Sequence, residues 1–512
     1  MSRLFLFAIG GTGARVVRSL TMMLASGIDG LDSSTEIVPI IIDYDLANGD
    51  KTRAIRALEK YAAIHDELYP NANQNYADHF FMTKLTPLSQ AGIANTTGLK
   101  DFEFNFGPGG TSMKFSEYLG LMSMDTVPKE RLTKDLLNAL YDDSTADSKD
   151  AELELDMNKG FKGNPNIGSV VFHDLRDTTE FHQFEGVFNA ATDSVFIVSS
   201  VFGGTGASGF PEIVNAIRSS PLATLQPATI GAALVLPYFD LQQYNPANGD
   251  TGAIDAASFN AKTRAALSFY ATNNGINSKV NALYYIGDEN HDSYEYNEGE
   301  DRQKNAAHVV EFVAASSIVD FMQDNRQQQI ANGHMAFEFS IKDERIGTSI
   351  QLPDFEHSTH TIVLDNLSSF AIAMKYYRDV ICGDRQEVSN STAFYNRFNL
   401  GSKLGRGLYY QLDEFLDAGV SPKNDWGFYS WLDELQAHAH KLYLYCMDKS
   451  KEMKEVLTYK TISERRLGKK PIADATISEK LSSKTKGVKD GSEQLLLKDL
   501  RDIMKDTYNN VK

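Results

Sequence analysis

The sequence predicts an α/β protein built on a mainly parallel β-sheet. Apolar segments of strand character alternate with segments that carry apolar residues at helical spacing, and this alternation is clearest within residues 1–325. In two places a predicted strand ends in a glycine-rich loop that leads into a predicted helix. In such folds helices cover both faces of the sheet, and ligands bind at the carboxyl ends of the strands.

The first glycine-rich loop follows the strand candidate at residues 3–9. Apolar residues from Val16 onward then continue at helical spacing. Because glycine lacks a Cβ atom, backbone N–H groups in such a loop can approach an anion at the positive end of the helix. We therefore expect this loop to bind phosphate through Gly10, Gly11, Thr12 and Gly13.

The second glycine-rich loop ends the apolar run at residues 195–202 and precedes a helical segment that begins near Phe210. It has the same strand, loop and helix order as the first. The expected phosphate contacts are Gly203, Gly204, Thr205 and Gly206.

A third bend lies between these two loops, at residues 159–168. Gly163, Pro165 and Gly168 favour a turn, and Asn164 can cap it or form a hydrogen bond across it. Three glycine loops, each beside a strand or helix end, are explained better by one polyphosphate ligand than by three unrelated turns.

These motifs resemble those of the tubulin/FtsZ superfamily, and the chain looks like a divergent bacterial member. Gly203-Gly-Thr-Gly-Ala-Ser-Gly209 resembles the family's signature loop, with Phe202 where the first glycine is usual. Gly163-Asn-Pro-Asn-Ile-Gly168 is similar to the GNPEIG phosphate loop of FtsZ, and it precedes the signature loop by about the separation that FtsZ uses. Gly10-Gly-Thr-Gly13 matches the family's first phosphate loop.

The resemblance implies that GTP or GDP binds together with Mg²⁺. Asp43 and Asp45, at the end of the strand candidate 38–43, would contact the metal or its water, and Asn164 would orient the phosphate loop. A long central helix is expected over residues 302–323, and Asn305 near its start is the candidate for reading guanine. Asn305 is chosen by position, not by a motif.

Hydrolysis and assembly are implied only by the family. FtsZ completes the active site of a neighbouring subunit with an N-x-D-x-x-D pattern, and this pattern is not found here. Asp320 and Asp324 lie in the corresponding region and are the catalytic candidates by position alone. The leading hypothesis, taken from the family, is a possible GTPase that self-associates into an oligomer or filament, or joins a hetero-complex.

Two other functions stay open. One is a nucleotide-sensing scaffold that keeps the tubulin-like fold and does not polymerise. The other is an NAD-dependent oxidoreductase, because Gly11-Thr-Gly13 and Asp43 resemble part of a dinucleotide fingerprint. In that hypothesis Val16 replaces the third glycine, and the other two glycine loops have no role.

Composition narrows the classes of partner. The formal net charge is −18. The body that precedes residue 449 is acidic, so nucleic acid is not expected for it. Residues 449–512 are mildly basic and are expected to form a solvated helical surface, and a partner for this tail, whether an acidic neighbouring subunit, a membrane surface or DNA, stays open. We expect no membrane span, and two cysteines without metal-ligand spacing agree with a cytoplasmic location.

The predicted organisation has three parts. Residues 1–325 would form the tubulin-like nucleotide-binding domain, with a large insertion at about 46–158. Residues 326–400 would form a smaller α/β second domain, and residues 401–512 a helical C-terminal extension. The aromatic stripe around Trp431 is expected to pack in a core.

Overall fold

The computed structural model gives the fold of most of the chain. It describes residues 2–29, 31, 34–45, 47–70, 79–93, 101–104, 113–124, 128–141, 152–157, 160–241, 257–272, 275–288, 292–294, 301, 303–331, 333–341, 349–350, 363, 365–381, 406–416, 425–442, 445–446, 457–458, 474–489 and 492–511.

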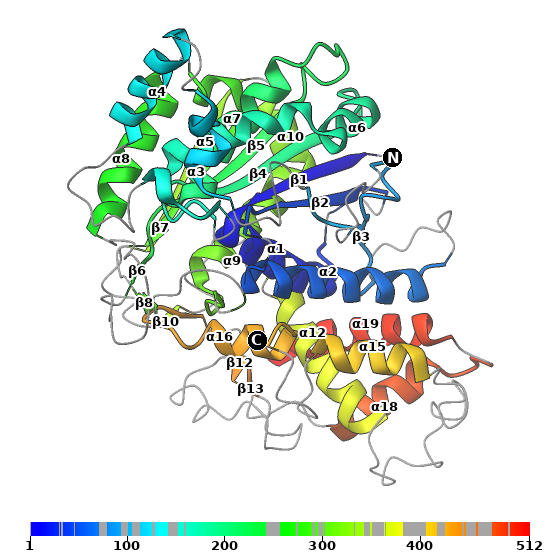
Figure 1. The fold of residues 1–512 in the computed structure, drawn as a ribbon. Coiled ribbons are helices and arrows are strands. Elements are labelled where there is room, and N and C mark those ends of the chain that lie inside the picture. Colours follow the sequence, from blue (N-terminus) through cyan, green and yellow to red (C-terminus); the bar gives the residue numbers. More distant parts are fainter. Residues whose placement is uncertain are drawn as a thin grey trace.

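The described residues form a seven-stranded sheet in which every neighbouring pair is parallel, in the order β3-β2-β1-β4-β5-β7-β9 (Figure 1). The predicted α/β class with a mainly parallel sheet is confirmed. The strands are β1 (Arg3–Ile9), β2 (Glu36–Ile42), β3 (Lys84–Leu85), β4 (Ser194–Ser200), β5 (Thr229–Val235), β7 (Ala282–Asp288) and β9 (Met335–Ile341). Short two-stranded ladders pair β6 (Phe239–Leu241) with β8 (Asp292–Tyr294), β10 (Ser349–Ile350) with β11 (Lys441–Leu442), and β12 (Tyr445–Cys446) with β13 (Leu457–Thr458).

Helices cover both faces of this sheet, because alternate side chains of each strand point to opposite faces. In β1, Leu4 and Leu6 join one core, whereas Phe5 and Phe7 join the other. In the first core, α1 (Gly10–Ala25), α2 (Gly49–Leu68) and α9 (Val309–Met322) pack against the sheet. The second is closed by α5 (Pro165–Phe172), α6 (Thr179–Val187), α7 (Gly204–Arg218) and α8 (Ala257–Thr272).

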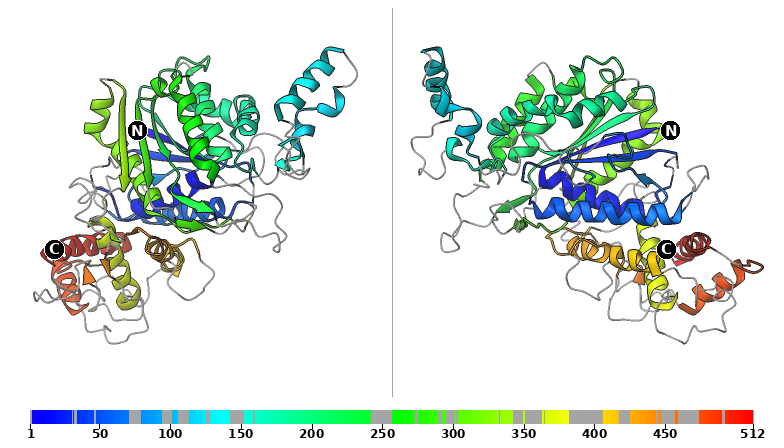
Figure 2. Two further views of the ribbon diagram at one scale, coloured as in Figure 1. Left: turned by 90° about the vertical axis from the view of Figure 1, so that its left-hand side faces the viewer. Right: turned by 45° about the vertical axis from the view of Figure 1, so that its right-hand side comes forward.

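The range predicted as an insertion contains two elements of the sheet domain itself. Helix α2 packs on α1, and β3 pairs with β2. Farther along, α3 (Phe115–Tyr118) leads to α4 (Pro128–Tyr141), which projects from the body (Figure 2). Residues 49–68 and 84–85 thus pack with the sheet domain, although they lie in the range predicted as an insertion.

The central helix α9 begins at Val309, later than the expected start at residue 302. His308 caps it by accepting a hydrogen bond from the Val310 N–H, and Glu311 completes a capping box. After α10 (Asp324–Ile330), β9 pairs with β7 and extends the main sheet past residue 325. The division into domains stays a prediction.

The C-terminal helices form a further layer that packs beside α1 and α2 (Figures 1 and 2). These are α12 (Asp365–Tyr376), α15 (Arg406–Leu416), α16 (Phe428–Glu434), α18 (Asp474–Lys484) and α19 (Glu493–Val511). Trp431 is buried, as expected, and its indole N–H donates to Ser19 Oγ at 3.0 Å.

The basic tail, expected to be solvated, instead contributes to the core. Leu496 and Leu500 of α19 are fully buried, and Arg501 pairs with Asp29 at 2.8 Å. The leucines of α19 set its buried face, and net charge gives no sign of them.

Within the described residues, no helix combines the length and the apolar character needed to cross a bilayer. The side chains of both cysteines lie outside the described residues. The cytoplasmic location stays a prediction.

Candidate functional site

The parallel register brings the predicted loops to one edge of the sheet. Ile9 pairs with Ile42, and Ala8 pairs with Val198. The residues that follow β1, β2 and β4 therefore leave the sheet side by side, at its carboxyl edge.

Close contacts join these loops and the third bend. A Cβ atom on Gly10 would lie 3.5 Å from Thr205 Cβ, so the first and second glycine loops touch. A Cβ atom on Gly204 would lie 3.0 Å from the backbone nitrogen of Asn164 and 3.1 Å from that of Gly163. The three bends that the sequence singled out thus converge on one place.

Three helix N-termini meet there, those of α1, α7 and α5. Among the described residues, none of these helices has a side-chain cap, and none has an acidic residue in its first turn. By contrast, α2 is capped by Asn48 and carries Asp50 in its first turn, and α9 is capped by His308. Free N–H groups at the positive ends of aligned helix dipoles favour an anion.

The predicted glycines do not all have the same role. Gly10 and Gly163 adopt positive φ angles of 70° and 76°, which favour glycine. A Cβ atom on Gly13 would lie 2.6 Å from the Ala8 carbonyl carbon, and one on Gly206 would lie 2.6 Å from Ser200 O. Glycine at these last two positions is therefore required for packing of the helices on the strands.

Nitrogen donors surround Gly11. Arg15 Nη1, Asn48 Nδ2 and Gln303 Nε2 each lie 3.5 Å from the position that its Cβ would take. On the other side of the site, Lys262 of α8 donates to Gly163 O at 2.8 Å. Nitrogen donors thus lie beside two of the three loops, and of these Arg15 and Asn48 are buried and donate to Asp50 and Asp43.

The metal candidates Asp43 and Asp45 directly follow β2 and are both buried. Asp43 accepts from the Asp45 N–H at 3.1 Å and from Asn48 Nδ2 at 3.0 Å. Burial raises the pKa of Asp43 to about 7, against the partial effect of Lys51. Gly160 contacts Asp45, with its Cβ position 3.9 Å from Asp45 Cβ, so these carboxylates lie beside the third bend. Buried carboxylate oxygens of this kind suit Mg²⁺.

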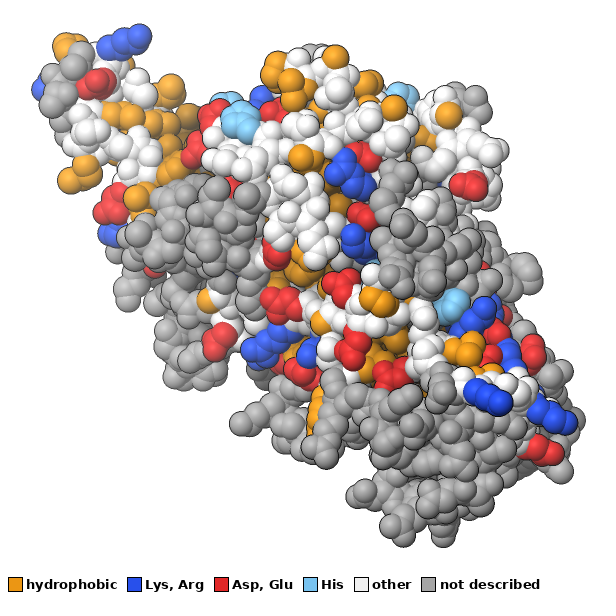
Figure 3. Space-filling view, turned by 90° about the vertical axis from the view of Figure 1, so that its right-hand side faces the viewer, with side chains coloured by type: hydrophobic (Ala, Val, Ile, Leu, Met, Phe, Trp, Pro, Cys, Tyr) orange, Lys and Arg blue, Asp and Glu red, His pale blue; other side chains and the backbone are white. Residues whose placement is uncertain are grey.

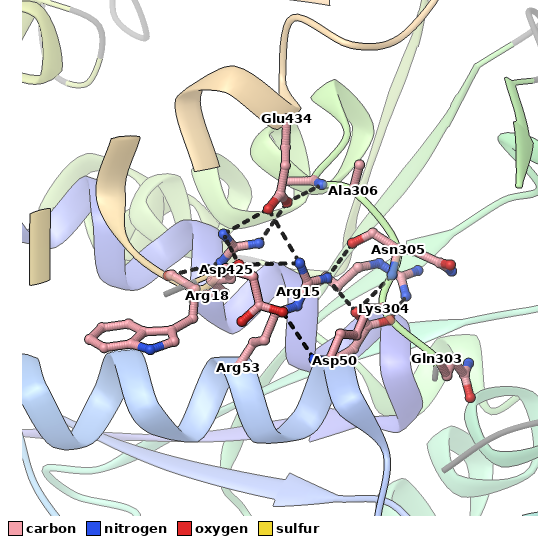
Figure 4. Close-up of polar contacts among 12 residues, drawn as sticks. Arg15, Arg18, Asp50, Arg53, Gln303, Lys304, Asn305, Ala306, Asp425 and Glu434 are labelled. Atoms are coloured by element: carbon pink, nitrogen blue, oxygen red, sulfur yellow. Dashed lines mark hydrogen bonds and ion pairs between the residues drawn. The ribbon is translucent and has the colours of Figure 1, made fainter. Parts of the chain in front are cut away.

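Asn305 lies before α9 in an extended segment, not on the helix. Its backbone N–H donates to Asp50 Oδ1 at 3.0 Å, and its carbonyl accepts from Arg53. Figure 4 shows this segment, from Gln303 to Ala306, passing the start of α2 close to Arg15. Asn305 is therefore near the loops, although no motif pointed to it.

A buried ion-pair network links this segment to the C-terminal layer (Figure 4). Asp50 pairs with Arg15 and Arg53, each at 2.6 Å. Glu434 of α16 pairs with Arg53 at 3.2 Å and with Arg18 at 2.7 Å. The network joins the first glycine loop to residues more than 400 positions away.

The catalytic candidates lie elsewhere. Asp320 is near the end of α9, where it pairs with Arg326 at 2.7 Å and accepts from Tyr284 at 2.7 Å. Tyr284 is near the start of β7, at the opposite edge of the sheet from the glycine loops. Asp324 is exposed in the first turn of α10. Neither carboxylate faces the loops of its own chain.

Phe202, which stands where the family has glycine, is a core residue. Its ring contacts those of Phe239 and Phe259, with centroids 5.6 Å and 5.0 Å away. Sequence reasoning missed Arg15, Asn48 and Lys262. The pattern Asn48-Gly-Asp50 before an apolar helix is a cap signal that was available, whereas nothing local marks Lys262.

Comparison with solved structures finds a distant likeness. The chain is similar to the solved structure of CetZ from Methanosaeta thermophila strain DSM 6194, at 13% sequence identity and a TM-score of 0.24. The likeness covers 56% of this chain and 46% of that chain, which is less than half of its length. No protein-family model and no curated protein matches the chain. At this TM-score the likeness carries no argument about function.

Proposed function

We propose that the chain binds a nucleoside triphosphate together with Mg²⁺ at the place where the three glycine loops meet. The observation that supports this most strongly is the meeting of three uncapped helix N-termini, those of α1, α5 and α7, at the carboxyl edge of a parallel sheet. A polyphosphate supplies several acceptor oxygens and negative charges, which such a set of donors requires.

Each loop has a distinct part in this proposal. The N–H groups of Gly10 to Gly13 and of Gly203 to Gly206 would bind the phosphates, with the Thr12 and Thr205 hydroxyls as further donors. Asp43, with Asp45, would hold Mg²⁺ or its water, and the metal would neutralise phosphate charge. Asn164 would orient the third bend, whose carbonyl at Gly163 already accepts from Lys262.

Guanine is proposed from the resemblance to tubulin and FtsZ, with Asn305 as the residue that reads it. Titration of the purified chain with GTP, GDP, ATP and NAD, each with and without Mg²⁺, tests this proposal. We expect GTP to bind most tightly and Mg²⁺ to strengthen its binding. Preferential NAD binding would contradict the assignment and favour the oxidoreductase.

Self-association that depends on the nucleotide is the second part of the proposal. Helix α4 offers a surface for it, since Leu132, Leu136 and Leu140 are 71%, 58% and 63% exposed on one side of the projecting helix. Hydrophobic side chains are visible on this arm at the upper left of Figure 3. Burying such a stripe against a second copy would be favourable. Because Asp320 and Asp324 do not face the loops of their own chain, they would contact only a nucleotide bound by a second copy.

Sedimentation with GTP, GDP and a slowly hydrolysed GTP analogue tests the assembly. We expect pelleting or faster sedimentation with GTP, and its loss when the three exposed leucines of α4 are replaced with serine. Tight GTP binding by a chain that stays monomeric would instead favour the non-polymerising scaffold.

A further inference from the structure

A second group of potential metal ligands contains none of the glycine-loop residues. Asp292 of β8, His308 at the cap of α9 and His438 after α16 come from three distant parts of the chain. One ligand atom from each lies within 4.8 Å of the other two. His308 and His438 are buried, and Asp292 is partly exposed.

We propose that Asp292, His308 and His438 bind a divalent transition metal, with Zn²⁺ as the best match. His308 Nε2 lies 3.2 Å from Asp292 Oδ2, and His438 Nδ1 lies 3.6 Å from the same oxygen. Ligands at the usual zinc distances stand about 3.3 Å apart along the edges of a tetrahedron. The two separations are therefore close to those of a tetrahedral zinc site.

Outer hydrogen bonds orient two of the three ligands. His438 Nε2 lies 2.9 Å from Ala307 O, so this nitrogen carries the proton and Nδ1 is left with a lone pair. Asp292 Oδ1 accepts from the Ala439 N–H at 2.9 Å, which leaves Oδ2 for the cluster. Hydrogen bonds of this kind fix the tautomer and rotamer of metal ligands in proteins.

His308 connects the metal to the start of α9. Its Nδ1 accepts from the Val310 N–H at 3.1 Å, so in the metal-free form Nε2 carries the proton and faces Asp292. When Nε2 binds the metal, the proton moves to Nδ1 and the Val310 N–H loses its acceptor. Metal binding and this helix cap therefore oppose each other, and binding should expose the Val310 amide to exchange.

The ligand types separate this site from the Mg²⁺ candidate. Two imidazole nitrogens and one carboxylate suit Zn²⁺ or a related transition metal, whereas Asp43 and Asp45 offer only oxygen. The partly exposed Asp292 leaves one side for a water as fourth ligand. A metal here would connect the segment after α16 to β8 and α9.

The test uses the full-length chain, stripped with a chelator and titrated with Zn²⁺ alone or with Co²⁺, whose visible spectrum reports tetrahedral binding. We expect one equivalent to bind, and Asp292→Asn and His438→Ala to weaken binding by 10-fold or more. His440→Ala is the matched control, because His440 is also buried on this segment but pairs with Asp288 at 2.8 Å. Its affinity for Zn²⁺ should be unchanged.

Two results would overturn the metal site. One is a wild-type chain that binds no stoichiometric Zn²⁺ or Co²⁺, which would make the cluster a hydrogen-bonded clamp. The other is an Asp292→Asn variant that keeps wild-type affinity. If His438→Ala does not fold, Asp292→Asn decides the question, because that side chain is partly exposed and the substitution keeps its shape. Hydrogen exchange at Val310 should also rise with Zn²⁺.

Discussion

Replacing Gly11 with aspartate should prevent phosphate binding while the fold persists. Gly11 is partly exposed, and three donor nitrogens lie 3.5 Å from the position of a new Cβ atom, which is an ordinary contact distance. The new carboxylate would lie in the loop whose N–H groups we propose bind the phosphates, and it would be held there by these donors. Gly204 is a poorer choice, because its Cβ position lies 2.9 Å from Phe161 Cβ and a side chain there would displace the third bend.

The expected effect follows from Coulomb's law. A carboxylate about 5 Å from one phosphate charge, at an effective dielectric constant of about 20, is repelled by roughly 3 kcal/mol. This corresponds to a loss of affinity of about 100-fold. The space that the new side chain takes beside the loop adds to the loss, so the figure is a lower bound.

Calorimetric titration with GTP and Mg²⁺ measures this effect. Gly11→Ala controls for the added volume and should change affinity little. Gly186→Asp adds the same charge on α6, where nothing among the described residues lies within 4 Å of the new Cβ atom, and should bind as the wild type does. Wild-type affinity in Gly11→Asp, with a normal thermal melt, would refute the placement of the phosphates at this loop.

Three further predictions concern charge. Burial raises the pKa of Asp43 to about 7, so the folded chain keeps a proton that the unfolded chain loses above its ordinary pKa of 3.8, and stability falls as pH rises through that window. In urea unfolding, the free energy of unfolding of Asp43→Asn relative to wild type should therefore be about 3 kcal/mol higher at pH 8 than at pH 5. The same difference between variant and wild type at both pH values would contradict this. Glu434→Gln removes the carboxylate that pairs with buried Arg18 and one of the two that pair with Arg53, and it should cost about 3 kcal/mol in the same assay. Glu414→Gln, which breaks a partly exposed pair with Lys60, should cost less than about 1 kcal/mol. Lys262→Ala removes the cation beside Gly163 and should weaken GTP binding about 10-fold at low salt but less at high salt; equal affinities at low salt would exclude this lysine from the site.

The sequence predicted the sheet and the meeting of the glycine loops because both depend on local pattern. A strand, a glycine turn and a helix are encoded within about fifteen residues, and the parallel sheet then places Gly10 and Gly203 at one edge. The start of α9 was missed because its cap is His308, and histidine is not among the preferred capping residues.

Contacts between distant segments were not predictable from one sequence. The pairing of Glu434 with Arg18 and Arg53 depends on the C-terminal layer packing beside α1 and α2. The approach of His438 to His308 depends on the same packing. Residue type alone gives no sign of either contact, since both follow from tertiary structure.

Hydrogen exchange with and without GTP and Mg²⁺ tests the central claim most directly. Backbone amides in residues 9–15, 160–168 and 200–209 should all become protected at the same nucleotide concentration, because a single polyphosphate contacts all three segments. Protection of only one segment, or midpoints that differ among the three, would contradict a single shared site.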